Sequence, residues 1–105
     1  MPEIRPEITA KIKEYLDLVE KRGIVVDAAY LFGSYAENTE TEESDIDLAI
    51  VSAQFDGVRI LDREKLLGLS RKVDVRISPL PMTKNAVKNS LFFNQEVLNK
   101  GIRIS

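Results

Sequence analysis

Residues 31–51 read LFGSYAENTETEESDIDLAIV. An apolar segment ends at Gly33-Ser34, a polar and acidic run follows, and a second apolar segment begins with Asp45 and Asp47. Side chains two residues apart in a strand point to the same face, with α-carbons about 6.5–7 Å apart. The spacing therefore predicts that the carboxylates of Asp45 and Asp47 lie side by side at the start of a strand.

This pair of carboxylates predicts a site for a hard divalent cation. Mg²⁺ is usually held by one or two carboxylates together with substrate phosphates, and two close carboxylates repel each other without a cation. Gly33-Ser34 adds a turn with exposed backbone N–H groups, close access to the backbone and a hydroxyl donor. The two motifs together suit metal-assisted attack at a phosphorus atom, which is the chemistry of nucleotidyl transfer. The acidic run over residues 37–43 is expected to be a solvated loop.

Hydrophobic periodicity predicts helices alternating with strands. Helices are expected over residues 6–22 and 62–72, and strands over residues 24–32, 45–51 and 73–77, with Pro79 and Pro81 ending the third strand. Thr83 is expected to cap a further helix that breaks near Phe92-Phe93, where Asn94 caps a second short helix. Residues 102–104 form an edge strand. This order predicts an α+β fold, with helices on one mixed sheet of three to four strands, and a single domain over residues 1–105.

Asp74 lies in the third expected strand, between Val73 and Val75. Its side chain then faces opposite to theirs, and it completes a three-carboxylate cluster with Asp45 and Asp47 if the two strands are neighbours. The alternative is that Asp74 is an exposed strand residue paired with Arg76 or Lys72.

Composition excludes several classes of site. The 105 residues contain no His and no Cys, which rules out the usual zinc sites, Ser-His-Asp triads and Cys nucleophiles. The net charge is −2, so direct binding of nucleic acid is not expected. No apolar run approaches the roughly 20 residues of a membrane span, and the first residues lack the blocks of a signal peptide. A cytoplasmic location is the expectation.

The chain resembles the nucleotidyltransferase superfamily with a DNA polymerase beta-type palm, and within it the short minimal nucleotidyltransferases of bacteria and archaea. The resemblance covers nearly the whole chain, and its motifs are Gly33-Ser34-Tyr35-Ala36, the segment 44–50 and Val73-Asp74-Val75. It implies a palm-like fold, ATP as substrate and Mg²⁺ or Mn²⁺ as cofactor. It also implies roles for single residues: Gly33 and Ser34 hold the triphosphate, Asp45, Asp47 and Asp74 form the catalytic metal site, and Asp74 also assists the acceptor hydroxyl.

Similar proteins are the antitoxins of two-gene toxin–antitoxin modules, whose partners are small helical toxins of the HEPN class. The resemblance implies transfer of AMP to a tyrosine of such a partner. Phe92 and Phe93 are adjacent and cannot both face the core of one helix, so this region is a candidate contact surface for the partner. A kink that buries both rings is the alternative for that region. The chain has Glu37 and Asn38 where the family usually has a basic residue and then Gly. The negative charge favours a second reading, an antitoxin that acts by binding alone; a small-molecule nucleotidyltransferase is the third.

Overall fold

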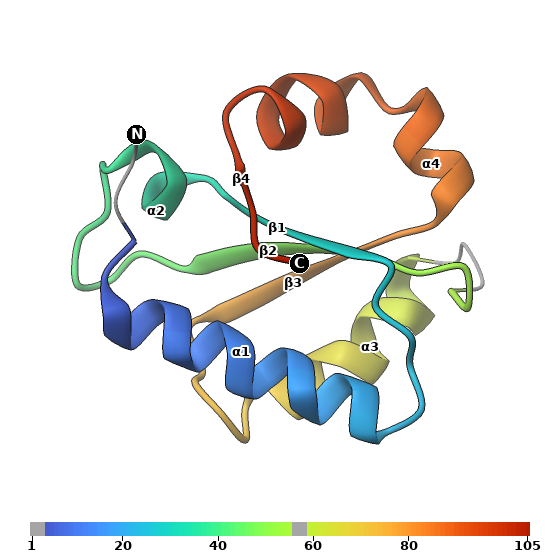
Figure 1. Cartoon of the computed structure of the whole chain (residues 1–105), viewed down its shortest axis with the longest axis horizontal. Coiled ribbons are helices and arrows are strands. Elements are labelled where there is room, and N and C mark those ends of the chain that lie inside the picture. The colour runs from blue at the N-terminus through green and yellow to red at the C-terminus, as the bar shows by residue number, and fades with distance from the viewer. Residues whose placement is uncertain (1–3, 56–58) are drawn as a thin grey trace.

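The computed structural model describes residues 4–55 and 59–105, and of residues 59 and 60 the backbone only. Within this part of the chain, four strands form one mixed sheet in the order β3-β2-β1-β4 (Figure 1). β1 pairs antiparallel with β2 and β4, whereas β2 and β3 are parallel. The predicted α+β fold with one mixed sheet is confirmed. The strands are β1 (Ala28–Phe32), β2 (Ile46–Val51), β3 (Ile77–Met82) and β4 (Ile102–Arg103).

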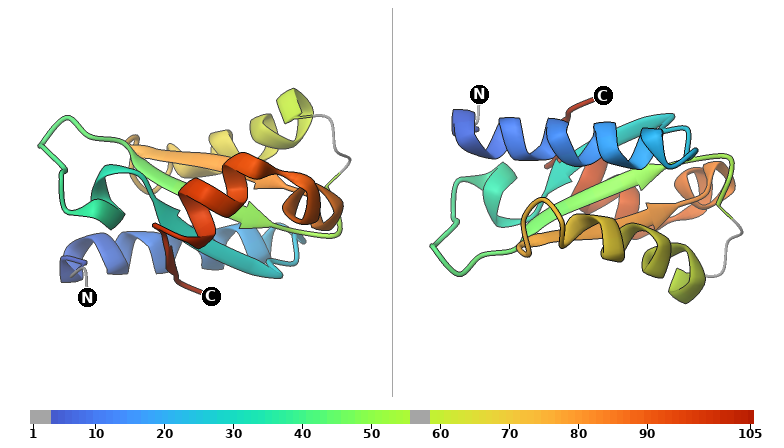
Figure 2. Two further views of the ribbon diagram at one scale, coloured as in Figure 1. Left: turned by 90° about the horizontal axis from the view of Figure 1, so that it is seen from above. Right: turned by 90° about the horizontal axis from the view of Figure 1, so that it is seen from below.

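Helices cover both faces of the sheet, as Figure 2 shows from its two sides. α1 (Pro6–Lys21) and α3 (Arg59–Ser70) pack on one face, and α4 (Lys84–Asn89) with the π-helix η1 (Phe93–Leu98) packs on the other. Alternate residues of β2 serve the two cores: Leu48 belongs to the α1 and α3 side, and Ala49 to the α4 and η1 side. Because strand side chains alternate, Asp47 shares the face of Ala49.

The first helix agrees closely with its sequence pattern. Its buried side chains are the five apolar residues at helical spacing, namely Ile8, Ile12, Tyr15, Leu16 and Val19. The helix ends at Lys21, one residue before the predicted end. The first strand begins later than predicted, at Ala28 instead of Ile24, and Val25 is exposed.

The predicted third strand over residues 73–77 is wrong. β3 begins at Ile77 and contains both Pro79 and Pro81, which had been expected to end a strand. Proline is tolerated because β3 lies at the edge of the sheet. Ile46 N donates to Arg76 O (2.8 Å), and Ser52 N donates to Met82 O (3.1 Å). The backbone N–H and C=O groups of the even-numbered residues in this segment therefore point toward β2. The odd-numbered prolines therefore carry their nitrogens on the outer side, where no donor is needed.

The C-terminal helical segment breaks earlier than predicted. Thr83 caps α4 as expected, since its Oγ1 accepts from Ala86 N (3.0 Å). The break falls at Ser90, whose Oγ accepts from Phe93 N (3.1 Å), so the predicted cap at Asn94 is wrong. Phe93 is fully buried, whereas Phe92 is 47% exposed and lies edge-on to Phe32 at a ring-centroid distance of 6.0 Å. A kink that buries both rings is thus excluded.

No helix among the described residues combines the length and the apolar character that crossing a membrane requires.

Candidate functional site

Gly33 joins the two motifs. It stands between β1 and the short helix α2 (Ser34–Glu37), with φ 72° and ψ −150°, a conformation that residues with a Cβ rarely adopt. Phe32 is the register partner of Asp47 in the β1–β2 ladder. A Cβ on Gly33 would overlap Oδ2 of Asp47 and lie 3.2 Å from its Cγ. The structure therefore places the Gly-Ser turn directly against the second aspartate.

The two aspartates lie at the start of β2. Asp45 precedes the strand and is exposed, and Asp47 is its half-buried second residue. Partial burial and the negative charge of Asp45 raise the pKa of the Asp47 carboxyl. Ionising both groups is therefore costly without a positive charge nearby. The donor set is two carboxylates beside an open turn, and this set fits Mg²⁺, which completes its shell with water and phosphate oxygens.

The helix after Gly33 closes on the Gly33 carbonyl, which accepts from the N–H groups of Ala36 and Glu37, both at 3.1 Å. The earlier amides of such a turn have no acceptor within the helix and remain available to an anion. Asn38 ends α2 in the left-handed conformation, with φ 59°. Asn is one of the few residues other than Gly that adopt it readily, so Asn38 fits the backbone at this position. Glu37 is exposed at the end of α2.

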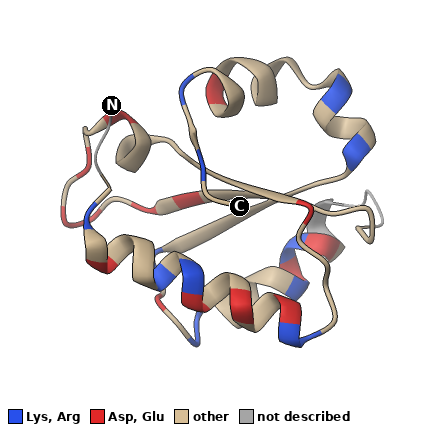
Figure 3. Cartoon of the chain, in the orientation of Figure 1, with Lys and Arg blue, Asp and Glu red and all other residues tan. Residues whose placement is uncertain are grey.

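Acidic residues are spaced along the loop between α2 and β2, as the red segments in Figure 3 show. Glu42 and Glu43 are exposed, and Glu40 lies 3.9 Å from Nη2 of Arg5. Ser44 Oγ accepts from Thr41 N (2.8 Å), which closes a turn within the loop. The prediction of a solvated loop is confirmed for residues 38, 39 and 41–43, which are exposed, whereas Glu37 ends α2 and only 12% of the Glu40 side chain is exposed.

Asp74 is not where the sequence pattern predicted it. It lies in the turn between α3 and β3, with 13% of its side chain exposed. Its carboxylate accepts from three groups of Arg76: the backbone N (2.9 Å), Nε (3.0 Å) and Nη2 (2.8 Å). These contacts with Arg76 hold the pKa of Asp74 below its usual range.

The structure shows the pairing of Asp74 with Arg76 that the alternative reading of the sequence gave, but Asp74 lies in a turn and is mostly buried, not in a strand and exposed. A carboxylate with a lowered pKa is a weak base, which argues against Asp74 as the proton acceptor. No group of three or more acidic side chains within the described residues is arranged to hold a metal ion. The predicted cluster of Asp45, Asp47 and Asp74 is therefore not formed.

Two residues near the two motifs, Arg76 and Ser78, were not assigned to the site from the sequence. Arg76 donates from Nη1 to the hydroxyl of Tyr35 (3.3 Å), and Ser78 is the register partner of Asp47. From the sequence, Arg76 was an alternative partner of Asp74. An edge strand with alternating prolines was the signal that could have revealed the register of Ser78.

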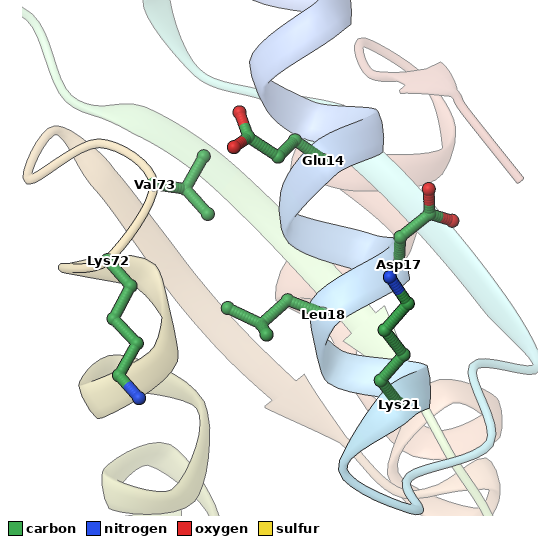
Figure 4. A pocket seen from close by; sticks show the side chains of 6 residues that line it. All are labelled: Glu14, Asp17, Leu18, Lys21, Lys72 and Val73. Atoms are coloured by element: carbon green, nitrogen blue, oxygen red, sulfur yellow. The ribbon is translucent and has the colours of Figure 1, made fainter.

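A hollow of about 330 Å³ lies away from this site, between α1 and the end of α3 (Figure 4). Its charges are mixed and it lies on the α1 and α3 side of the molecule, not on the Asp47 face. We assign it no part in the chemistry. Its lining residues are Glu14, Asp17, Leu18, Lys21, Lys72 and Val73.

Known proteins are similar to this chain in sequence and in fold. A family model described as polymerase beta, nucleotidyltransferase matches residues 10–105. A Methanocaldococcus jannaschii protein named "putative protein adenylyltransferase" is 31% identical over 106 residues, covering 97% of this chain and 92% of that protein.

Several solved structures are similar in fold to this chain. A structure named as a "putative nucleotidyltransferase" from Sulfolobus solfataricus aligns with a TM-score of 0.66 at 18% identity, over 92% of this chain and 78% of that one. A toxin–antitoxin structure with AMP-PNP aligns with a TM-score of 0.65 at 25% identity, over 92% and 72%. A mutant of the toxin–antitoxin MntA-HpeT aligns with a TM-score of 0.63 at 22% identity, over 89% and 71%.

Proposed function

Because the chain belongs to the polymerase beta nucleotidyltransferase family, we propose that it transfers AMP from ATP to a hydroxyl group of a partner protein. The observation that carries this proposal is the contact between Gly33 and Asp47. It unites a turn suited to phosphate with a pair of carboxylates suited to a cation, and nucleotidyl transfer needs both.

Each motif has a distinct role in this proposal. Gly33 allows the triphosphate close to the backbone, and Ser34 donates its hydroxyl to a phosphate oxygen. Asp45 and Asp47 would hold Mg²⁺, which when bound supplies positive charge at the α-phosphate and the departing pyrophosphate. A bond forms between the acceptor oxygen and the α-phosphorus, the bond to pyrophosphate breaks so that pyrophosphate leaves, and the acceptor hydroxyl releases its proton to solvent water. Asp74, which is held by Arg76, has no chemical role in this scheme.

A protein acceptor is supported by the comparisons. The archaeal relative carries the name of a protein adenylyltransferase, and two structures of similar fold are toxin–antitoxin assemblies, one of them with an ATP analogue. We therefore propose a helical toxin of the HEPN type as the partner and one of its tyrosines as the acceptor. In this role the chain is an antitoxin that acts by modifying its partner.

A catalytically weak antitoxin that acts by contact alone is the second candidate. Glu37 favours it, because this exposed carboxylate stands where the family usually places a cation. A negative charge close to the triphosphate would weaken binding of ATP.

The test is to purify the tagged chain from its native host with whatever protein accompanies it, and to incubate the complex with Mg²⁺ and ATP. Intact-mass measurement should show one or more adenylyl groups on the partner. The Asp45→Asn, Asp47→Asn double variant should add none. The double variant Glu42→Gln, Glu43→Gln is the matched control, since it removes the same charge from the adjoining loop, and it should transfer like the parent.

The three possible failures have different meanings. A complex that forms but carries no adduct in the parent would support the contact-only antitoxin. Transfer that survives in the Asp45, Asp47 double variant would place the chemistry elsewhere. A chain recovered without any partner and without transfer would overturn the proposal.

A further inference from the structure

Arg76 contacts a neighbour of each half of the candidate site: Tyr35, which follows Gly33-Ser34, and Ile46, which stands between Asp45 and Asp47. We propose that it is a positioning residue, which holds Gly33-Ser34 in a fixed place relative to Asp45 and Asp47. This inference rests on the proposed function, since it concerns how the nucleotide site is held together.

The side chain of Arg76 reaches the Gly-Ser half. Its Nη1 donates to the hydroxyl of Tyr35 at 3.3 Å. Tyr35 directly follows Ser34, and its ring belongs to the core beneath α2, with only 3% of the residue exposed. A tie to its hydroxyl therefore acts one residue from the phosphate-binding turn.

The backbone of Arg76 reaches the carboxylate half. Its carbonyl accepts from Ile46 N at 2.8 Å, and Ile46 stands between Asp45 and Asp47. The pairing of Ile46 with Ile77 continues this contact into the β2–β3 ladder. One residue thus joins the turn at the end of β1 to the start of β2.

Asp74 fixes the orientation of the Arg76 side chain. Its two carboxylate oxygens accept from Nε and Nη2 at 3.0 and 2.8 Å, a two-point contact that holds the planar guanidinium in one position. Nη1 is then directed to Tyr35. Lysine has a single ammonium group and cannot reproduce this geometry.

Direct binding of phosphate by Arg76 is the competing explanation, because 37% of its side chain is exposed. The contacts argue against it. Nε, Nη1 and Nη2 each donate to Asp74 or Tyr35, which commits three of the five guanidinium N–H groups, and the Asp74 carboxylate balances the positive charge. This arrangement favours a positioning role over capture of an anion.

Binding of a ligand that contacts both halves of the site should weaken when the Arg76 contacts are lost. Binding of a ligand that contacts only one half should not change. We would measure affinity for Mn²⁺ alone by electron paramagnetic resonance, and for a Mg²⁺ complex of a non-hydrolysable ATP analogue by calorimetry. Tyr35→Phe removes only the hydroxyl and should weaken binding of the analogue about three- to tenfold, the value of one hydrogen bond. Arg76→Lys should weaken it at least as much, and Mn²⁺ affinity should stay within about twofold of the parent in both variants.

Tyr30→Phe is the matched control. Tyr30 lies on β1 but contacts Phe93 and Arg103, not Arg76, so loss of its hydroxyl should leave both affinities unchanged. Unaltered binding of the analogue in Tyr35→Phe would overturn the proposal. So would weakening in Arg76→Lys alone, which would identify a direct phosphate ligand. A parallel loss of Mn²⁺ and analogue binding would indicate a merely structural residue.

Hydrogen exchange separates this proposal from the proposed function, because it needs no nucleotide. The amides of Ala36 and Glu37, which donate to the Gly33 carbonyl, should exchange faster in Tyr35→Phe than in the parent and in Tyr30→Phe. If the parent binds no nucleotide, the proposed function fails, but the exchange rates still decide the role of Arg76. Equal exchange rates of these amides in the parent and in Tyr35→Phe would contradict a positioning role for Arg76.

Discussion

The carboxylate of Asp47 occupies the space that a side chain on residue 33 would need. The antiparallel register that pairs Phe32 with Asp47 produces this contact, because Gly33 follows Phe32 directly. Two motifs separated by an acidic loop are thereby brought to one end of the sheet. Several consequences of this arrangement can be measured.

Replacing Gly33 by alanine should damage both stability and binding. The backbone there has a positive φ, and the new Cβ would meet the Asp47 carboxylate. We expect a loss of about 1–3 kcal/mol in the free energy of unfolding, measured in urea. Gly68→Ala is the control: a Cβ on Gly68, in α3, would meet no atom within 4 Å, so this change should stabilise by up to about 1 kcal/mol. Equal changes in the free energy of unfolding for Gly33→Ala and Gly68→Ala would contradict the close contact between residue 33 and Asp47.

Asp47→Asn should stabilise the metal-free protein at neutral pH. Burial and Asp45 raise the pKa of Asp47 in the folded state, so its ionisation costs stability as the pH rises through that pKa. Removing the charge should gain up to about 1 kcal/mol at pH 7. The gain should disappear in acid, below the ordinary Asp pKa, where the parent is protonated in both states. Thermal unfolding across this pH range would reveal the difference, and a destabilised variant at pH 7 would refute the account of the pair.

Asp74→Asn should have the opposite effect and destabilise the protein at neutral pH. Arg76 lowers the pKa of Asp74, so this carboxylate stabilises the fold above its ordinary pKa, and the contribution is lost as the pH falls through the folded-state pKa. We expect a loss of about 1–3 kcal/mol at pH 7, since the variant loses the negative charge and replaces one of the two acceptor oxygens by a donor that faces Arg76. The affinity for Mn²⁺ alone should remain near that of the parent. If Mn²⁺ binding falls as far as in Asp47→Asn, Asp74 is a third ligand after all.

The two adjacent phenylalanines should respond very differently to substitution. Phe93→Ala should cost about 3–5 kcal/mol because the ring is fully buried. Phe92 is about half exposed, so Phe92→Ala should cost far less. If Phe92 and the exposed Leu91 contact the partner, Phe92→Ala should reduce the amount of partner that co-purifies while the chain stays folded. Full recovery of the partner would remove this surface from consideration.

The sequence predicted much of the architecture because its strongest signals are local. The spacing of apolar residues in α1 and the Thr83 cap needed no knowledge of distant contacts. The family assignment from Gly33-Ser34 and Asp45-Ile46-Asp47 is also confirmed, by the match over residues 10–105.

The errors concern features that depend on the sheet as a whole. Pro79 and Pro81 normally argue against a strand, and only the edge position of β3 with its register explains them. The alternation of Val73, Asp74 and Val75 suggested a strand. The Asp74 carboxylate instead accepts from the backbone amide and the guanidinium of Arg76, two residues further along the chain. Such a competition between a local turn and a ladder cannot be decided from spacing alone.

The central claim is that Asp45 and Asp47 bind a cation together with a nucleoside triphosphate held at Gly33-Ser34. A ligand that binds only the folded state raises the unfolding temperature, so thermal unfolding with Mg²⁺ and a non-hydrolysable ATP analogue tests the claim directly. The parent and the Glu42→Gln, Glu43→Gln control should both be stabilised, in a manner that requires Mg²⁺. The Asp45→Asn, Asp47→Asn variant should lose that response entirely. Stabilisation of this variant to the same extent as the parent, or none in the parent itself, would contradict the account.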